Sequence, residues 1–174
     1  MNKHDDTLLD WIRLHITENG LSDSHKKECW NKFGDLKSMV VIDSSGFTST
    51  TSQSGILHCL SLLVQIRDMI CPILAQFDAQ NVRCEADNFF MEFDAPLDAL
   101  NACVAVHQAV LARNLCIDKS FQYALCMGIG YGAVLNAGDE GVFGDEMNIA
   151  SKLGEDIANA HELLLSAAAY EQIK

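Results

Sequence analysis

Two short strand-like segments of this chain each carry an aspartate at the point where the strand pattern breaks. A continuous apolar run, Val40-Val41-Ile42, precedes Asp43, and Ser44-Ser45-Gly46 then interrupts it. Such a run is typical of a buried strand, and the small residues after it leave free backbone groups beside the carboxylate. We therefore expect a strand whose end can receive phosphate groups.

The second segment predicts a β-hairpin with Asp87 at its tip. Strand-like residues run from Val82 to Glu85 and from Phe89 to Phe93, on either side of Ala86-Asp87-Asn88. A tight turn there would hold the carboxylate clear of both strands. Two such carboxylates can bind two magnesium ions, which stabilise the attacking and leaving oxygens of an in-line displacement at phosphorus. Each aspartate taken alone is more typical of an ordinary turn residue.

Apolar periodicity predicts the elements around these two segments. The expected elements are an amphipathic helix from Leu8 to about Asn19-Gly20, a polar stretch, a strand over Met39–Ile42, a helix from Gly55 to about Gln80 kinked at Pro72, the hairpin, a helix from Pro96 to about Asn114, strands over Phe121–Ile129 and Ala133–Asn136 around a Gly130-Tyr131-Gly132 turn, a helix from Asp145 to about Ala160, a strand over Leu163–Leu165 and a last helical turn. This order predicts an α+β fold with helices over one face of a mainly antiparallel sheet.

Composition is that of a soluble domain with one core, since 49% of the 174 residues are apolar. The seven cysteines are odd in number and lack a Cys-x-x-Cys pair. They are typical of reduced thiols in a cytosolic protein rather than disulfides or a zinc site, and the six histidines show no ligand spacing. No apolar stretch is expected to approach the length of a membrane span, and the acidic N-terminus does not resemble a signal peptide. We predict a cytoplasmic location and no membrane contact.

The net charge of −12 lies mostly in the second part of the chain, where residues 38–174 hold six basic and seventeen acidic side chains. A field of this sign repels nucleic acid and anionic membranes. A triphosphate bound there would need its charge offset by metal ions and by the few cations present. The sequence therefore predicts no nucleic-acid partner.

Four segments of the chain resemble the catalytic domain of class III nucleotidyl cyclases, in order and in spacing. They are Asp43-x-x-Gly46-Phe47-Thr48, the Ala86-Asp87 hairpin, Met127-Gly128-Ile129-Gly130-x-Gly132, and Val142-Phe143-Gly144-Asp145-x-x-Asn148-Ile149-Ala150-Ser151-Lys152-Leu153. The resemblance runs from Met39 to Ile173 and implies a ferredoxin-like core. It implies a catalytic domain over 38–174, which the helix predicted from periodicity precedes as an N-terminal helical extension over residues 1–37. The implied reaction is attack of a ribose 3′-hydroxyl on the α-phosphate of a nucleoside triphosphate, which gives a 3′,5′-cyclic nucleotide and pyrophosphate.

The resemblance also implies roles for individual residues in a site that holds two Mg²⁺ or Mn²⁺ ions. Asp43 and Asp87, with Ser44 beside them, match the metal site, and Phe47 is expected to pack under the metal loop next to the substrate. Two further catalytic residues belong to the helix near the C-terminus. Asn148 matches the asparagine that orients the ribose, and Lys152 stands where the family has a transition-state arginine.

Lysine at position 152 keeps the positive charge but lacks the planar fork of arginine, and a solvated helix cation is the alternative interpretation. In the family the site lies between two domains, so the resemblance implies a symmetric homodimer. The apolar face of the first helix would either contribute to that interface or pack on its own domain.

The positions that read the nucleobase in the family match neither the adenylate nor the guanylate pattern. Here they are Arg83 and Gly141. Arginine offers only hydrogen-bond donors, and glycine has no side chain to read an exocyclic group. Arg83 donating to O2 of uracil or cytosine is chemically sensible, and a short cyclase with altered base-reading positions resembles the pyrimidine cyclases of bacterial anti-phage signalling. UTP or CTP is therefore the favoured substrate.

Two other functions stay open from the sequence. One is an adenylate cyclase with altered base-reading residues. The other is a catalytically silent cyclase-homology domain that acts as a regulator, which Lys152, Gly141 and Ala86 favour. Retention of Asp43 and Asp87 argues against silence, because a domain without metal has no physical reason to hold two desolvated carboxylates together.

Overall fold

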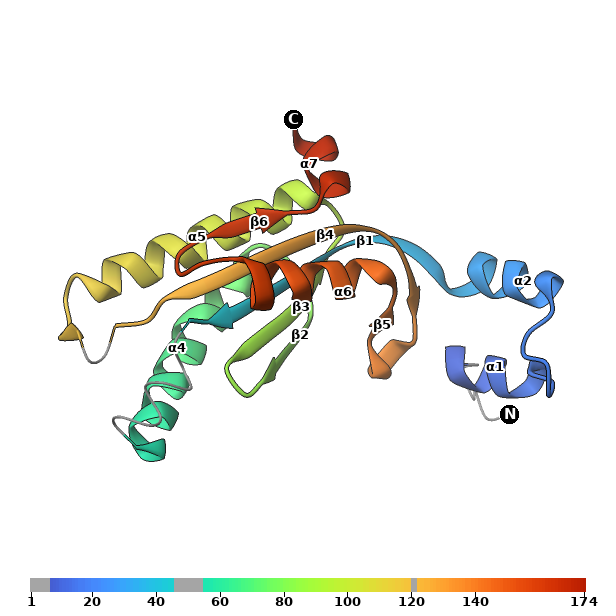
Figure 1. Cartoon of the computed structure of the whole chain (residues 1–174), viewed down its shortest axis with the longest axis horizontal. Coiled ribbons are helices and arrows are strands. Elements are labelled where there is room, and N and C mark those ends of the chain that lie inside the picture. The colour runs from blue at the N-terminus through green and yellow to red at the C-terminus, as the bar shows by residue number, and fades with distance from the viewer. Residues whose placement is uncertain (1–6, 46–54, 120–121) are drawn as a thin grey trace.

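The two central strands of the sheet are long and paired along their whole length. In the computed structural model, which describes residues 7–45, 55–119 and 122–174, β1 (Gly34–Ser44) is antiparallel to β4 (Leu125–Asn136), as Figure 1 shows. Residues 37–42 of β1 are buried on both faces, which explains the continuous apolar run before Asp43. The strand begins at Gly34, earlier than the predicted Met39, because its first residues pair with the far end of β4.

The remaining strands complete one sheet in the order β2-β3-β1-β4-β5. The predicted hairpin is confirmed as β2 (Gln80–Glu85) and β3 (Asn88–Phe93), and β3 pairs antiparallel with β1. Two short strands border β4: β5 (Val142–Phe143) is antiparallel to it, and β6 (Leu163–Leu165), also predicted, is parallel to it.

The predicted turn at Gly130-Tyr131-Gly132 is wrong, because β4 runs straight through these residues. Gly128, Gly130 and Gly132 alternate along the strand and so face the same side of the sheet. That side is covered by a helix: an added Cβ at Gly130 would lie 2.5 Å from the carbonyl oxygen of Glu146, and one at Gly132 would lie 2.8 Å from the Glu146 Cγ. These glycines therefore mark a close helix approach rather than a chain reversal.

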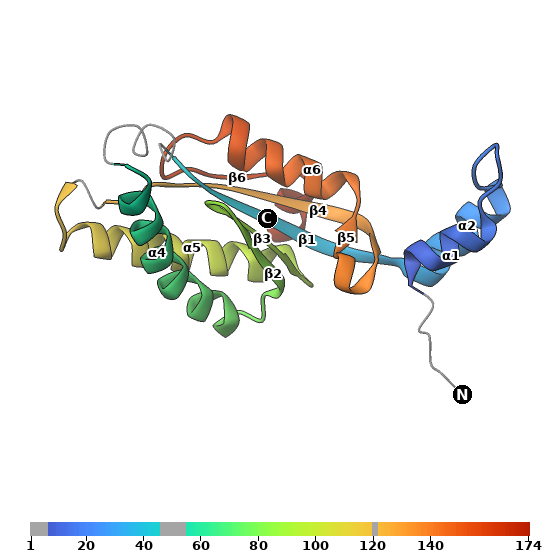
Figure 2. The ribbon, with the colours of Figure 1, turned by 90° about the horizontal axis from the view of Figure 1, so that it is seen from below.

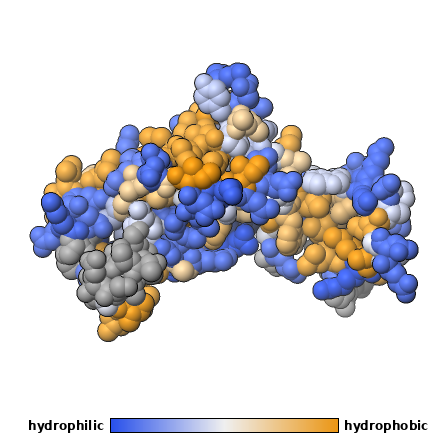
Figure 3. Space-filling view, viewed as in Figure 1, coloured by the Kyte–Doolittle hydropathy of each residue, from blue (hydrophilic) through white to orange (hydrophobic). Residues whose placement is uncertain are grey.

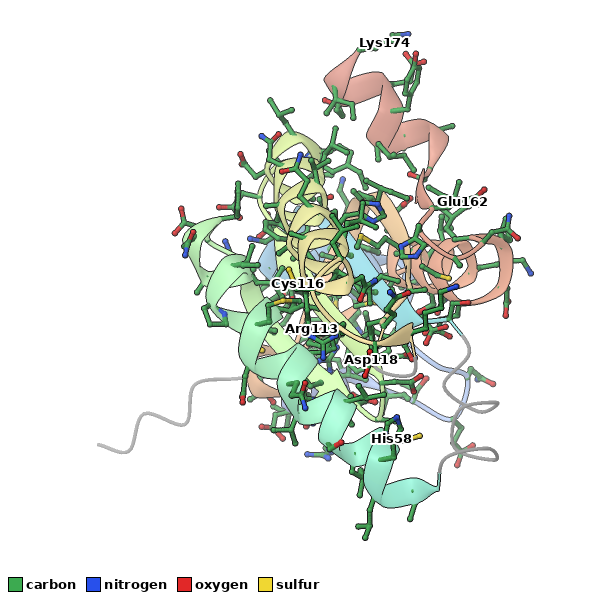
Figure 4. The ribbon with its side chains drawn as sticks, turned by 90° about the vertical axis from the view of Figure 1, so that its left-hand side faces the viewer. His58, Arg113, Cys116, Asp118, Glu162 and Lys174 are labelled. Carbon is green, nitrogen blue, oxygen red and sulfur yellow. The ribbon has the colours of Figure 1, made fainter. Side chains whose placement is uncertain are left out.

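Helices cover both faces of the sheet, so the prediction of helices over one face is incomplete (Figure 2). One face carries α4 (Ile56–Gln76), α5 (Pro96–Asn114) and α7 (Ala167–Ile173), which bury the larger apolar core. Gln65 of α4 accepts a hydrogen bond from Arg113 of α5 at 2.8 Å, and Figure 4 labels Arg113 beside these two helices.

The opposite face carries α6 (Asp145–Ser151), which continues as a π-helix, η3 (Lys152–Ile157). The helix α6 packs on a smaller apolar cluster that includes Met39, Val41 and Ala150, and Gly154 of η3 lies close to the backbone of β1 and β4. The predicted helix from Asp145 to about Ala160 is thus present but changes its winding at Lys152.

Two helices at the N-terminus form a hairpin at one end of the molecule (Figures 1 and 2). The first, α1 (Leu8–His15), is shorter than predicted, and α2 (Asp23–Phe33) was not predicted, because its sequence is polar and only Cys29 is buried. Leu8 and Trp11 are buried against Cys29 and against Ala137, which follows β4. The apolar face of α1 therefore packs within its own chain.

The helix α4 corrects the expectation about membrane spans, since by length and composition it is apolar enough to cross a membrane. Six of its residues, including Ile66, Ile70 and Leu74, are buried in the protein core. Its first turns expose Leu57, Leu60 and other apolar side chains, which form the patch at the lower left of Figure 3. All seven cysteines are free thiols, as predicted.

Candidate functional site

The fold brings Asp43 and Asp87 to the same end of the sheet. Asp43 lies near the end of β1, and Asp87 lies in the turn between β2 and β3, whose second strand pairs with β1. The Ser44 hydroxyl donates a hydrogen bond to Oδ2 of Asp87 and so joins the two segments directly. Phe47, Gly46 and Thr48 lie outside the described residues.

The electrostatics of this end of the sheet are those of a crowded carboxylate site. The pKa of Asp43 is raised to about 6, mainly by burial and also by the nearby charges of Asp87 and Glu155, against a hydrogen bond from the Ser44 backbone that lowers it. The pKa of Glu155 is also raised, first by burial and then by Asp156 and Asp87. Negative charge has therefore been gathered where a cation would relieve it.

The donor set fits a hard divalent cation. The Asp43 and Asp87 carboxylates supply the oxygen ligands that Mg²⁺ and Mn²⁺ prefer. Within residues 7–45, 55–119 and 122–174, no group of three or more His, Cys, Asp or Glu side chains has an arrangement able to hold a metal ion. The two aspartate carboxylates and neighbouring backbone oxygens are therefore the candidate ligands at this end of the sheet.

Glu155 was not singled out from the sequence, and the fold places it at this site. Asn88, which follows Asp87, donates from Nδ2 to Oε1 of Glu155 at 3.2 Å. Glu155 belongs to η3, so this contact ties the end of the π-helix to the hairpin. The two residues are far apart in the chain, and no local pattern joins them.

Two further residues missed by the sequence reasoning lie beneath the hairpin, on the side of α4. The Arg67 guanidinium donates from Nη2 to the carbonyl oxygen of Ala86. The Tyr123 side chain is buried, and its pKa is raised to about 12, mainly by this burial. The pKa also responds to Ser44, which lowers it, and to the charge of Asp87, which raises it, so the hydroxyl lies near both groups. The scarcity of cations in residues 38–174 was the one available signal for Arg67.

The two predicted base-reading positions, Arg83 and Gly141, lie next to each other. A Cβ added at Gly141 would lie 2.8 Å from Nη1 of Arg83, and the glycine has φ = +88°, a conformation that other residues rarely adopt. The Nε of Arg83 is buried and has no hydrogen-bond partner among the described residues. One donor of the guanidinium is therefore unused within the described residues.

Asn148 and Lys152 are both exposed and stand one helical turn apart, where α6 passes into η3. In the part of the chain that the structure describes, no hydrogen bond or ion pair joins either side chain to Asp43 or Asp87. The chain thus presents two separate groups of predicted site residues.

The architecture is that of class III nucleotidyl cyclase catalytic domains. An adenylate/guanylate cyclase/hydrolase from Silicibacter pomeroyi superposes with a TM-score of 0.66 at 23% identity, over 79% of each chain. The monomeric guanylyl cyclase domain of the RhoGC fusion protein from Blastocladiella emersonii gives a TM-score of 0.71 at 15% identity, over 81% of this chain and 88% of that one. At these identities the likeness establishes the fold.

Comparison at the level of sequence gives one curated relative, a putative adenylate cyclase 3 from Rhizobium meliloti (strain 1021). It is 20% identical over 138 residues, which are 79% of this chain and 23% of the relative. The chain therefore spans less than a quarter of that protein's length. No protein-family model matches the chain.

Proposed function

We propose that this chain is a nucleotidyl cyclase that converts a nucleoside triphosphate, with UTP or CTP favoured, into a 3′,5′-cyclic nucleotide and pyrophosphate. The observation that carries the proposal is the meeting of Asp43 and Asp87 at one sheet end, in a fold shared with cyclase catalytic domains. Residues 38–174 would form the catalytic domain and 1–37 a helical extension, in a cytoplasmic protein.

The metal site would be formed by Asp43, Asp87 and the backbone at Ser44. When bound, two Mg²⁺ or Mn²⁺ ions would offset the charge of the triphosphate and of the reacting oxygens. The protein's own contribution is to hold two carboxylates at the close spacing that their mutual repulsion opposes, and the Ser44 hydroxyl does this by binding one oxygen of Asp87.

The second group of residues would act on the nucleotide from a partner subunit. Asn148 would orient the ribose, and Lys152 would place a positive charge near the α-phosphate as negative charge develops there. Both are exposed and have no hydrogen bond to the aspartates of their own described chain, as expected if each site is completed by a second copy. A symmetric homodimer with two sites is therefore part of the proposal.

Pyrimidine preference is supported by the contact between Arg83 and Gly141. The Arg83 guanidinium has a buried Nε that is unpaired among the described residues, and it lies against a residue without a side chain. O2 is an acceptor common to uracil and cytosine, so donors alone suffice to bind it. The cyclic product would serve as a second messenger, and the resemblance to pyrimidine cyclases suggests anti-phage defence as its setting.

A purine substrate is the second candidate. The curated relative has the name of an adenylate cyclase. Arg83 would then stand in for the lysine of adenylate cyclases and donate to a ring nitrogen. A silent regulatory domain is the third, supported by a lysine at position 152 in place of arginine.

The test is to incubate the purified chain with ATP, GTP, CTP and UTP separately, with Mg²⁺ and then Mn²⁺, and to identify products by mass. A cyclic pyrimidine from the wild type, absent in D43N, is the expected result. R83M should then reduce the preference between UTP or CTP and the purines, while the exposed-arginine variant R13M should not. Cyclic AMP alone would favour the second candidate, and no product from an intact dimer would favour the third.

A further inference from the structure

The turn that carries Asp87 has a backbone conformation that its sequence disfavours. Ala86, directly before Asp87, has φ = +50°, in the left-handed region that glycine adopts readily and alanine does not. Glu85 pairs with Asn88 across the hairpin, so Ala86 and Asp87 alone form the tip. Any drift of Ala86 toward a relaxed conformation would therefore turn the Asp87 side chain away from its present direction.

Arg67 reaches this turn from α4, on the far side of the hairpin from α6. Its Nη2 donates to the carbonyl oxygen of Ala86, the peptide oxygen that directly precedes Asp87. The Nε of Arg67 is buried and lacks a hydrogen-bond partner among the described residues, so the bond from Nη2 is what directs the guanidinium toward the turn. The Tyr123 hydroxyl lies close to both Arg67 and Asp87 and helps to enclose this region.

A second contact acts on Asp87 from β1. The Ser44 hydroxyl binds Oδ2 of Asp87, which fixes the rotation of the carboxylate once the backbone of the turn is in place. The two contacts have different roles. Arg67 binds the backbone carbonyl that precedes Asp87, and Ser44 binds the Asp87 carboxylate itself. A carboxylate held at both points needs little rearrangement to bind a cation.

We propose that Arg67 is a positioning residue for Asp87, which stabilises the left-handed Ala86 turn through the Ala86 carbonyl and so directs the carboxylate toward Asp43. This inference rests on the proposed function in one respect, the assignment of a divalent metal to these aspartates. Arg67 itself contacts neither metal nor substrate in this scheme.

The test measures Mn²⁺ binding by electron paramagnetic resonance of the free ion, together with thermal unfolding of the metal-free chain. R67M removes the donor and keeps the apolar stem, and it should weaken Mn²⁺ binding about tenfold. A86G in the R67M background should restore most of the affinity, because glycine adopts the left-handed conformation without support. R13M, which removes an exposed arginine of α1, should bind Mn²⁺ like the wild type.

Three results would overturn the inference. One is unchanged Mn²⁺ affinity in R67M with a lowered unfolding temperature, which would make Arg67 merely structural. Another is an R67M/A86G protein that binds as weakly as R67M, since Arg67 would then act through its charge and not through Ala86. The third is a wild-type chain that does not bind Mn²⁺ at all.

The positioning role and the cyclase activity can fail separately. Mn²⁺ binding with the expected order of variants, but no cyclic nucleotide from any triphosphate, would sink the proposed function and leave the role of Arg67 standing. Should R67M fail to fold, R67L takes its place, because leucine is apolar and has no donor for the Ala86 carbonyl, and it should bind Mn²⁺ more weakly than the wild type. Wild-type affinity in R67L would overturn the inference.

Discussion

At the scale of single residues, the fold disfavours the ionised form of the Asp43 carboxyl, which is the form that a metal site needs. Burial, with help from Asp87 and Glu155, raises its pKa from 3.8 to about 6. Between these two pH values the folded protein binds more protons than the unfolded chain, so the stability of the fold falls as the pH rises. The ionised carboxylate at neutral pH therefore destabilises the protein that holds it, a cost that a bound cation would relieve.

We predict that D43N is more stable than the wild type at pH 8, by about 1 kcal/mol after allowance for screening of a partly exposed group, and no more stable at pH 4. Urea denaturation of the metal-free protein at the two pH values gives the comparison. D118N, which neutralises an exposed aspartate, is the matched control and should show no such pH dependence. A gain of equal size at both pH values would contradict the assignment.

The sequence pointed to Asp43 and Asp87 but not to Arg67, Tyr123 or Glu155. The two aspartates interrupt strand patterns, so local chemistry marks them. The other three come from a helix, a connection and a π-helix, and they reach the site only because the sheet and its two helical layers are assembled around it. When a residue acts on another only through a tertiary contact, the residues next to it in the sequence form no pattern that would identify it.

At the scale of elements, the contact between α6 and β4 depends on glycines. An added Cβ at Gly128 would lie 2.6 Å from the Gly154 amide nitrogen and closer still to the Ala150 carbonyl oxygen. Both are backbone atoms of α6 and η3, which cannot move aside as the end of a flexible side chain does. This close packing fixes the position of α6 and η3, which carry Asn148 and Lys152, relative to the sheet.

We predict that G128A destabilises the fold by about 3 kcal/mol, because the helix has to lift from the sheet. G138A is the contrasting variant: nothing lies within 4 Å of its added Cβ, and φ = +65° is the one source of strain. It should lose about 1 kcal/mol. If urea denaturation gave the same loss of unfolding free energy for G128A and G138A, the packing of α6 on β4 would not depend on Gly128.

The same elements show why a pattern of glycines misled the sequence analysis. Gly130-Tyr131-Gly132 has the composition of a turn, yet β1 offers an unbroken partner strand and α6 needs a flat surface. The polar helix α2 was missed for a related reason, since its place depends on α1 and the end of β4 and not on an apolar face of its own.

At the scale of the whole molecule, the predicted site residues fall into two groups on one chain. Asp43 and Asp87 lie at one end of the sheet. Asn148 and Lys152 are exposed where α6 passes into η3, on the face of the sheet opposite α4 and α5. In the proposed homodimer each site takes one group from each copy, so a single dimer contains two sites. A site shared between two subunits can be restored by mixing two inactive variants, whereas a site within one chain cannot.

We predict that D43N and K152A, each inactive alone, recover activity when unfolded together, mixed and refolded. Random pairing places one intact site in half of the dimers, so the mixture should reach about a quarter of wild-type activity. Mass measurement of the cyclic product gives the readout, and D43N mixed with D87N is the control that should stay inactive. No recovery in the first mixture, with heterodimers present, would exclude a site shared between subunits.

The sequence by itself determined the first strand, the hairpin, the two long helices α4 and α5 and the two aspartates, because these depend on periodicity and on residues adjacent in the chain. The tertiary structure decided the rest. It extended β1 beyond its predicted ends, joined two predicted strands into the single strand β4, placed helices on both faces and set Arg83 against Gly141. These features arise from contacts between residues far apart in sequence, whose strength depends on packing and burial in three dimensions rather than on any local pattern.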